Sequence, residues 1–345
     1  MIFEDLYNFN YFENDLYDAF CMQSCVKNVL DFWGYKNSFS FLNATLMLEL
    51  HESKNSNMGF DILYDLSYHS VLHFCSENIV DEWKDCSETE NVLCENMLAL
   101  AKGVIPIVQV DSYYLPYLPY YKKSHGAHSI ILCGSDNYSN IYVVDWMKPW
   151  FFKGKISRRE FLQARESNNE YDNGPFSGYP ISNKWIGIRN IKWDMPLYNA
   201  LSITIKESIL NFYEKNSKDK VFSGLNALKW LYNRMMTNED DIGMFCQYIY
   251  DKLYFYYKKH LLLLNYLKSI QNVNIKYVPK ICTEYLENLV LKYDIWFRVL
   301  LKTRFSKSQK NFDIICEKFQ EIVICEKNFF EKIDEIYGVT SNEQK

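Results

Sequence analysis

Apolar and polar residues follow two different patterns along this chain, and the change falls near residue 195. Before this point, short apolar runs alternate with polar turns, which is typical of a mixture of strands and helices. After it, apolar residues recur at helical spacing, and Pro279 is the only proline beyond Pro196. We therefore predict an α+β protein, with a mixed domain over residues 1–195 followed by an all-helical domain over residues 196–345.

The first half opens with two predicted helices. An apolar helix over about residues 20–33 is expected to begin near Asp18 and to end at Gly34, because glycine is common directly after helix ends. A second helix over about residues 90–102 is closed by Gly103 in the same way.

Strands follow these helices. Val104–Val110 is an apolar run interrupted by Pro106, a pattern typical of an edge strand or a bulge. Two short apolar runs on either side of a polar turn then predict a β-hairpin, Ser129–Cys133 with Ile141–Val144. A capping box and a last apolar run complete this half: a helix opened by Ser157–Glu160 and ending near Arg165, and a strand over Lys184–Trp193.

The second half carries helical periodicity over most of its length. We expect a bundle of five helices, over Leu201–Tyr213, Val221–Met236, Ile242–Ile270, Pro279–Leu301 and Phe312–Ile336. Its apolar richness would permit a homodimer but does not require one.

Composition excludes several classes of protein. Apolar residues make up 48% of the chain, which is enough for a buried core, and the net charge of −5 argues against nucleic acid as a partner. The amino-terminal residues lack the features of a signal peptide, and no apolar run is long enough to span a membrane. The ten cysteines include no Cys-x-x-Cys pair. We therefore expect a cytoplasmic protein with reduced cysteines and no bound metal or cofactor.

Cys21 is a candidate nucleophile because it lies at the start of the first predicted helix. The helix dipole and the unpaired N–H groups there favour a thiolate, and the same N–H groups can stabilise an oxyanion. Cys25 lies one turn further along, where packing against the sheet is expected. Taken alone, the position of Cys21 favours an inert buried cysteine over a nucleophile.

His128 and Asp145 are candidates to assist this thiol. His128 begins one strand of the predicted hairpin and Asp145 ends the other, so an antiparallel pairing brings imidazole and carboxylate together. The carboxylate would then hold the ring in one tautomer and direct it at the thiol. A core histidine and a turn aspartate are the alternative for this pair, and only the combination with Cys21 favours catalysis.

The order of these residues resembles two related families. Cys21 followed by an apolar helix and Gly34, then His128, Asp145 and Ser157-Arg-Arg-Glu-Phe161, is similar to papain-like peptidases that process bacteriocin leaders. A closer resemblance is to the butirosin-biosynthesis H-type proteins, which have a Gly-x-Pro strand ending in Val-Asp, then Leu-Pro-Tyr, then the histidine strand. The corresponding segments here are Gly103–Asp111, Leu115-Pro-Tyr117 and His125-Gly-Ala-His128. The resemblance spans about residues 20–165.

This resemblance implies a papain-like fold and an acyltransferase of secondary-metabolite assembly, as in thiotemplated pathways such as that of closthioamide. The expected donor is an acyl group on the phosphopantetheine arm of an acyl or peptidyl carrier protein, and the expected acceptor is a small amine. Cys21 would form the acyl-enzyme, with His128 and Asp145 completing a triad. A peptidase or amidase with the same triad, and a non-catalytic binding module on the same fold, remain alternatives.

Further residues are candidates for substrate contacts. Papain-like peptidases place a Gln before the nucleophile as an oxyanion donor; this chain has none there, and Asn14 is the expected substitute. His125 reads either as a substrate contact or as a loop histidine. Residues of the Leu-Pro-Tyr region would line the acyl or amine pocket, or else brace the strand: Asp111, Tyr113, Tyr114 and Tyr117.

Overall fold

The computed structural model of the chain describes residues 2–11, 20–35, 38, 44–53, 58–64, 79–80, 88–136, 139–146, 151–172, 176–190, 197–213, 220–238 and 240–340. The fold is α+β, with antiparallel sheets and a helical carboxy-terminal region, as predicted. It divides into two compact units, Met1–Asn43 with Tyr68–Met195, and Ala44–Ser67 with Pro196–Lys345.

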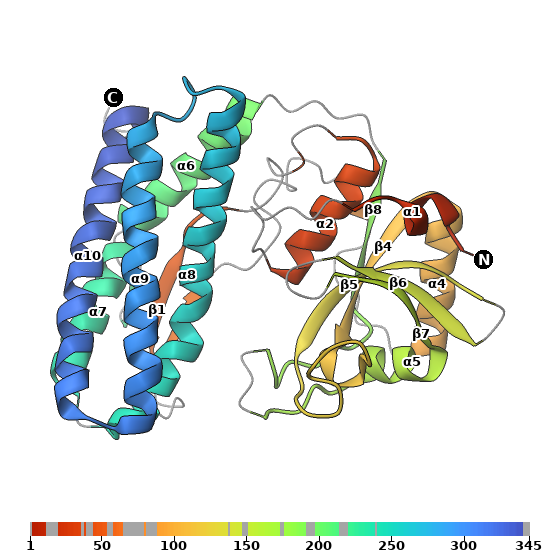
Figure 1. The fold of residues 1–345 in the computed structure, drawn as a ribbon, viewed down its shortest axis with the longest axis horizontal. Coiled ribbons are helices and arrows are strands. Elements are labelled where there is room, and N and C mark those ends of the chain that lie inside the picture. Colours follow the sequence, from red (N-terminus) through yellow and green to blue (C-terminus); the bar gives the residue numbers. More distant parts are fainter. Residues whose placement is uncertain are drawn as a thin grey trace. The chain divides into compact units, whose positions relative to one another are not determined.

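The first unit is built on a six-stranded antiparallel sheet with the strand order β3-β8-β4-β5-β6-β7 (Figure 1). Its strands are β3 (Ile79–Val80), β4 (Val104–Asp111), β5 (Ala127–Ser135), β6 (Asn140–Asp145), β7 (Phe152–Ser157) and β8 (Trp185–Arg189). Its helices are α1 (Glu4–Asn8), α2 (Cys21–Phe32), α4 (Thr89–Ala101), the 3₁₀ turn η3 (Ser112–Tyr114) and α5 (Arg158–Glu166).

Both faces of this sheet are covered, which explains why its central strands are almost continuously apolar. Alternate residues of a strand point to opposite faces. Ile107 and Ile131 therefore pack with Val29 of α2, while Val108 and Ile130 belong to the core on the opposite face. That second core includes residues from α4 and α5. Because both faces are covered by apolar cores, polar functional side chains are expected at the ends of the strands.

Local signals set the boundaries of α2 as expected. The helix begins at Cys21, its N-cap is Phe20, and its carboxy-terminal turn is followed by Gly34 at φ +77°. Ser157 caps α5 through its side chain, which accepts a hydrogen bond from the Glu160 N–H. The predicted start near Asp18 lies outside the described residues.

The prediction of an edge strand or bulge at Pro106 was wrong. Strand β4 lies inside the sheet, between β8 and β5. Its pairing with β5 begins only at Ile107, while Pro106 stands opposite Gly187 of β8. The missing N–H of the proline therefore removes no bond from the β4–β5 ladder, and an apolar side chain can occupy this central strand.

The second unit combines helices with a three-stranded antiparallel sheet of order β2-β1-β9. Its helices are α6 (Leu197–Tyr213), α7 (Gly224–Met236), α8 (Ile242–Val273), α9 (Lys280–Ser306) and α10 (Gln309–Tyr337), so the predicted helical pattern is confirmed. Its strands are β1 (Leu48–Glu52), β2 (Phe60–Tyr64) and β9 (Val221–Ser223). None of the described helices combines the length and the apolar character needed to cross a bilayer.

The small sheet explains why residues 44–67 belong to the second unit, although the sequence prediction placed them in the first domain. Strand β1 pairs on one side with β2 and on the other with β9, where Glu49 stands opposite Ser223. This pairing joins segments that are far apart in the sequence, so no local sequence pattern predicts it.

Candidate active site

The amino terminus of α2 presents Cys21 at the first helical position. The first bond within the helix runs from the Ser24 N–H to the Phe20 carbonyl at 2.9 Å. The Cys21 N–H precedes this bond and, like other first-turn N–H groups, has no acceptor within the helix. The half-buried thiol therefore lies in the positive field of a helix end.

His128 and Asp145 meet as the hairpin predicted. The His128 Nε2 lies 2.7 Å from the Asp145 Oδ2, and both side chains are largely buried. His128 also hydrogen-bonds Cys21. Because Nε2 is engaged by the carboxylate, Nδ1 is the ring nitrogen left for the thiol. The structure therefore brings all three predicted residues into one hydrogen-bonded chain.

This arrangement moves the pKa values of the thiol and the imidazole in opposite directions. Burial alone would raise the pKa of Cys21, but the charge of His128 and hydrogen bonds from His128 and Ser129 outweigh it, so the pKa is lowered. Burial would lower the pKa of His128, yet Asp145 and Cys21 raise it well above its usual value. Both shifts act in favour of a thiolate–imidazolium pair.

Cys25 has a different environment. Its side chain is buried, and its Sγ lies 3.3 Å from the Ser129 carbonyl oxygen, to which it donates a hydrogen bond. Burial first, and then the charges of Asp145 and Cys21, raise the pKa of Cys25 well above its usual value. A buried, protonated thiol is a poor nucleophile, so Cys21 is the more reactive of the two.

Tyr117, predicted either to line a substrate pocket or to brace the strand, contacts Asp145. Its hydroxyl donates to the Asp145 Oδ2 at 2.9 Å, so this one oxygen accepts hydrogen bonds from both Tyr117 and His128. The Tyr117 ring stacks on Phe152 with centroids 3.7 Å apart. A second tether comes from Asn28 of α2, whose side-chain amide donates to the Trp146 carbonyl at 2.9 Å. These contacts hold the carboxylate in place.

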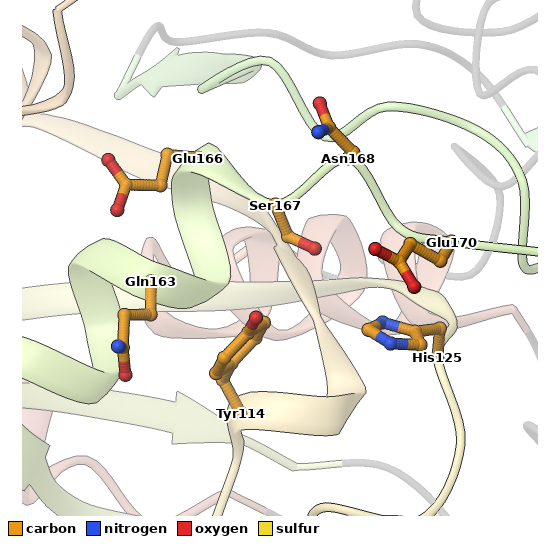
Figure 2. Close-up of a pocket in the computed structure, with 7 residues that line it drawn as sticks. All are labelled: Tyr114, His125, Gln163, Glu166, Ser167, Asn168 and Glu170. Carbon is orange, nitrogen blue, oxygen red and sulfur yellow. The ribbon is translucent and has the colours of Figure 1, made fainter.

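Asp111 and His125 form a second His–Asp pair, with the His125 Nδ1 2.7 Å from the Asp111 Oδ2. Asp111 is fully buried, which favours the expected role of bracing the strand over contact with a pocket. Tyr113 stacks on the His125 ring at 4.3 Å, and Tyr114 lines a surface pocket beside it (Figure 2). His125 is thus neither a free loop histidine nor part of the Cys21 chain. Asn14 lies outside the described residues.

Sequence reasoning missed this second pair as a unit. The available signal was the same as for the first pair, since Asp111 ends a strand and His125 stands just before the next. Among the described residues, no three histidine, cysteine, aspartate or glutamate side chains are grouped as metal ligands. The expectation that no metal or cofactor is bound stays a prediction.

Residues 21–146 match a family model described as butirosin biosynthesis protein H, N-terminal. No curated protein matches the chain. The matched segment begins at Cys21 and includes His128 and Asp145, so it contains the whole hydrogen-bonded chain.

Proposed function

We propose that this protein forms an amide by acyl transfer, because residues 21–146 match a family model described as butirosin biosynthesis protein H, N-terminal, and this match suggests an acyltransferase-like biosynthetic enzyme. The donor is a thioester on the phosphopantetheine arm of a carrier protein, and the acceptor is an amine. The observation that carries the proposal is the hydrogen-bonded chain from Cys21 through His128 to Asp145. It supplies a thiolate with an adjacent proton carrier.

In the first step, the Cys21 thiolate attacks the thioester carbonyl. The carbon–sulfur bond to the pantetheine arm breaks, and the His128 imidazolium gives its proton to the departing thiolate. The products are an acyl-Cys21 thioester, a free pantetheine thiol and a neutral imidazole. First-turn N–H groups of α2, including that of Cys21, are oriented to stabilise the oxyanion of this step.

In the second step, the nitrogen of a neutral amine attacks the acyl-Cys21 carbonyl. A carbon–nitrogen bond forms, the bond to the Cys21 sulfur breaks, and the neutral His128 takes the proton that the amine loses. The amide leaves and the thiolate–imidazolium pair is restored. Asp145 stabilises the imidazolium in both resting and product states, with Tyr117 holding the carboxylate.

The same three residues also support hydrolysis of a peptide or an amide, with water as the second nucleophile. The family match favours transfer, because the description of that family refers to biosynthesis, in which bonds are formed. The choice between amine and water is a matter of relative rates at one acyl-enzyme, so one assay separates the two functions.

The test supplies an acyl-loaded carrier protein, or the acyl thioester of N-acetylcysteamine, with a panel of amines, and follows products by mass spectrometry. We expect an acyl adduct on Cys21 and amide formation, both lost in Cys21→Ala and kept in Cys25→Ala. Ready peptide cleavage with no amide from any thioester would establish the peptidase instead. Failure of Cys21 to acylate with either donor would favour a binding module.

A further inference from the structure

A pocket of about 250 Å³ opens beside the second His–Asp pair. It is lined by polar side chains from η3, from the segment before β5, from the carboxy-terminal end of α5 and from the segment that follows α5: Tyr114, His125, Gln163, Glu166, Ser167, Asn168 and Glu170 (Figure 2). Such a lining does not suit an acyl chain, which would seek apolar walls. The pocket therefore suits a polar ligand.

The pocket lies near the end of the sheet that carries the Cys21 chain. Strand β5 runs antiparallel to β4 and β6, so its start lies beside the ends of both neighbours. Asp111 ends β4, Asp145 ends β6, and the two histidines precede or begin β5. Three residues of chain span at most about 10 Å between the Cα atoms of His125 and His128. The pocket at His125 and the Cys21 chain therefore lie at the same end of the sheet.

Asp111 determines how His125 faces the pocket. The Oδ1 of Asp111 accepts from the Tyr113 and Gly126 N–H groups at 3.0 and 3.1 Å. Its Oδ2 accepts from the Ser167 hydroxyl at 2.6 Å and lies 2.7 Å from the His125 Nδ1. A carboxylate with this many donors accepts only, so Nδ1 carries a proton. In the neutral ring, Nε2 is then a hydrogen-bond acceptor, and no described residue donates to it.

The charges around the pocket are negative. Glu166 and Glu170 are exposed carboxylates in the lining, and Asp111 is a buried carboxylate behind His125. No lysine or arginine stands among the described residues that line the pocket. Glu166 accepts a hydrogen bond from Thr89 at 3.3 Å, whereas Figure 2 shows the Glu170 carboxylate on the His125 side. Glu170 is therefore the carboxylate best placed for a ligand in the pocket.

We propose that this pocket binds a cationic amino group of the acceptor amine. Glu170 forms the ion pair, and the His125 Nε2 accepts a hydrogen bond from the ammonium group. The identity of the ligand rests on the proposed acyl transfer, since that reaction needs an amine. The complementarity of charge rests on the pocket alone: two carboxylates and the amide oxygens of Gln163 and Asn168 line it, no lysine or arginine does among the described residues, and an ammonium group offers only donors and positive charge.

The test compares Glu170→Gln with Glu95→Gln. Both substitutions remove one exposed carboxylate from the first unit, but Glu95 lies on α4 and does not line the pocket. Binding of putrescine, with 1,4-butanediol as its uncharged counterpart, is measured by calorimetry on a Cys21→Ala background. We expect Glu170→Gln to weaken putrescine binding about fivefold at low salt, in the range of an exposed ion pair, and Glu95→Gln to leave it unchanged. The difference should shrink in 1 M salt.

Kinetics then separate the pocket from the proposed function. With Cys21 intact, Glu170→Gln should raise the KM for a cationic amine and leave the rate of Cys21 acylation unchanged. If Glu170→Gln and Glu95→Gln both form the amide with equal KM values for the amine, the pocket does not bind the amine, and the acyl-transfer function stands. Glu170-dependent putrescine binding without acylation of Cys21 supports the cation site while the acyl-transfer function fails. Equal putrescine binding in both variants overturns the inference.

Discussion

At the scale of single residues, the Cys21 chain depends on one carboxylate oxygen. The Asp145 Oδ2 accepts from His128 and from Tyr117, and the side chain is 1% exposed. A buried carboxylate of this kind stabilises the imidazolium and also fixes the direction of the ring. Tyr117 therefore influences the Cys21 thiol only indirectly, through Asp145 and His128, and is a positioning residue.

Replacement of Tyr117 tests this positional role. Tyr117→Phe should lower kcat several-fold with little change in KM, because the ring still stacks on Phe152 while one hydrogen bond to Asp145 is lost, a change of about 1 kcal/mol. Asp145→Asn should cost more, and Cys21→Ala should abolish turnover. The measurement is steady-state kinetics on the acyl thioester. A large rise in KM for Tyr117→Phe would show instead that the hydroxyl contacts substrate.

The opposite pKa shifts predict a pH dependence. Because the pKa of Cys21 is lowered, the thiolate should persist below the pH of an ordinary thiol and be lost only as pH falls through that lowered value. Because the pKa of His128 is raised, the imidazolium should persist through neutral pH and be lost as pH rises through the raised value. Activity should therefore be bell-shaped with its plateau around neutrality, while alkylation of Cys21 should have only the acid limb.

Iodoacetamide labelling at pH 6, followed by mass spectrometry, measures this in a Cys94→Ser background that removes an exposed competitor. Cys21 should react rapidly and Cys25 should not. His128→Ala should slow labelling of Cys21 at pH 6, because the thiol loses its cationic partner. Labelling of Cys25 faster than Cys21, or a Cys21 labelling rate that is unchanged in His128→Ala, would contradict the ion pair.

At the scale of elements, a buried polar cluster joins three helices of the second unit. Glu326 of α10 accepts from the Tyr293 hydroxyl of α9 at 2.7 Å, and its Oε1 lies 2.9 Å from the His260 Nε2 of α8. All three side chains are fully buried. Burial first, and then the charge of Glu326, raise the pKa of Tyr293 well above its usual value. The cluster therefore links α8, α9 and α10 through buried polar side chains.

Removing the carboxylate should destabilise the unit. Glu326→Ala leaves buried donors unpaired and is expected to lower the free energy of unfolding by about 3 kcal/mol. Glu321→Ala on the same helix is the control: its exposed ion pair with Lys292 should contribute less than about 1 kcal/mol. Urea denaturation followed by circular dichroism compares the two. Equal midpoints would mean that the cluster adds nothing to stability.

At the scale of the whole molecule, the chain crosses between its units more than once. Residues 44–67 leave the first unit, supply β1 and β2 to the second, and return. Apolar side chains of this hairpin are buried in the second unit: Leu48, Leu50, Phe60 and Ile62. A cut at residue 195 therefore separates β1 from β9.

This topology predicts how fragments behave. The fragment 1–195 should expose the apolar face of the β1–β2 hairpin and aggregate, because β9 and the helices that cover the hairpin are missing. The same fragment with residues 44–67 replaced by a short Gly/Ser linker should remain monomeric. Size-exclusion chromatography with an apolar-surface dye distinguishes them. An unmodified fragment as monodisperse as the linker version would contradict the assignment of the hairpin.

The sequence by itself determined those features whose signals are local. The helix that begins at Cys21 and is followed by Gly34, the helix capped by Ser157 and the pairing of His128 with Asp145 all arise between residues close in the chain, where spacing and turn chemistry leave few arrangements. The long helices of the second half follow from their apolar period in the same way.

Only the tertiary structure decided what depends on distant partners. Pro106 can lie in a central strand because the pairing of β4 with β5 begins only at Ile107. Residues 44–67 belong to the second unit because β1 pairs with β9, which lies far along the chain. The burial of Asp111 behind His125 requires Ser167, which arrives from another element. These outcomes depend on which apolar surfaces remain to be buried once the local elements have formed. The residues of a strand do not by themselves determine which distant strand will pair with it.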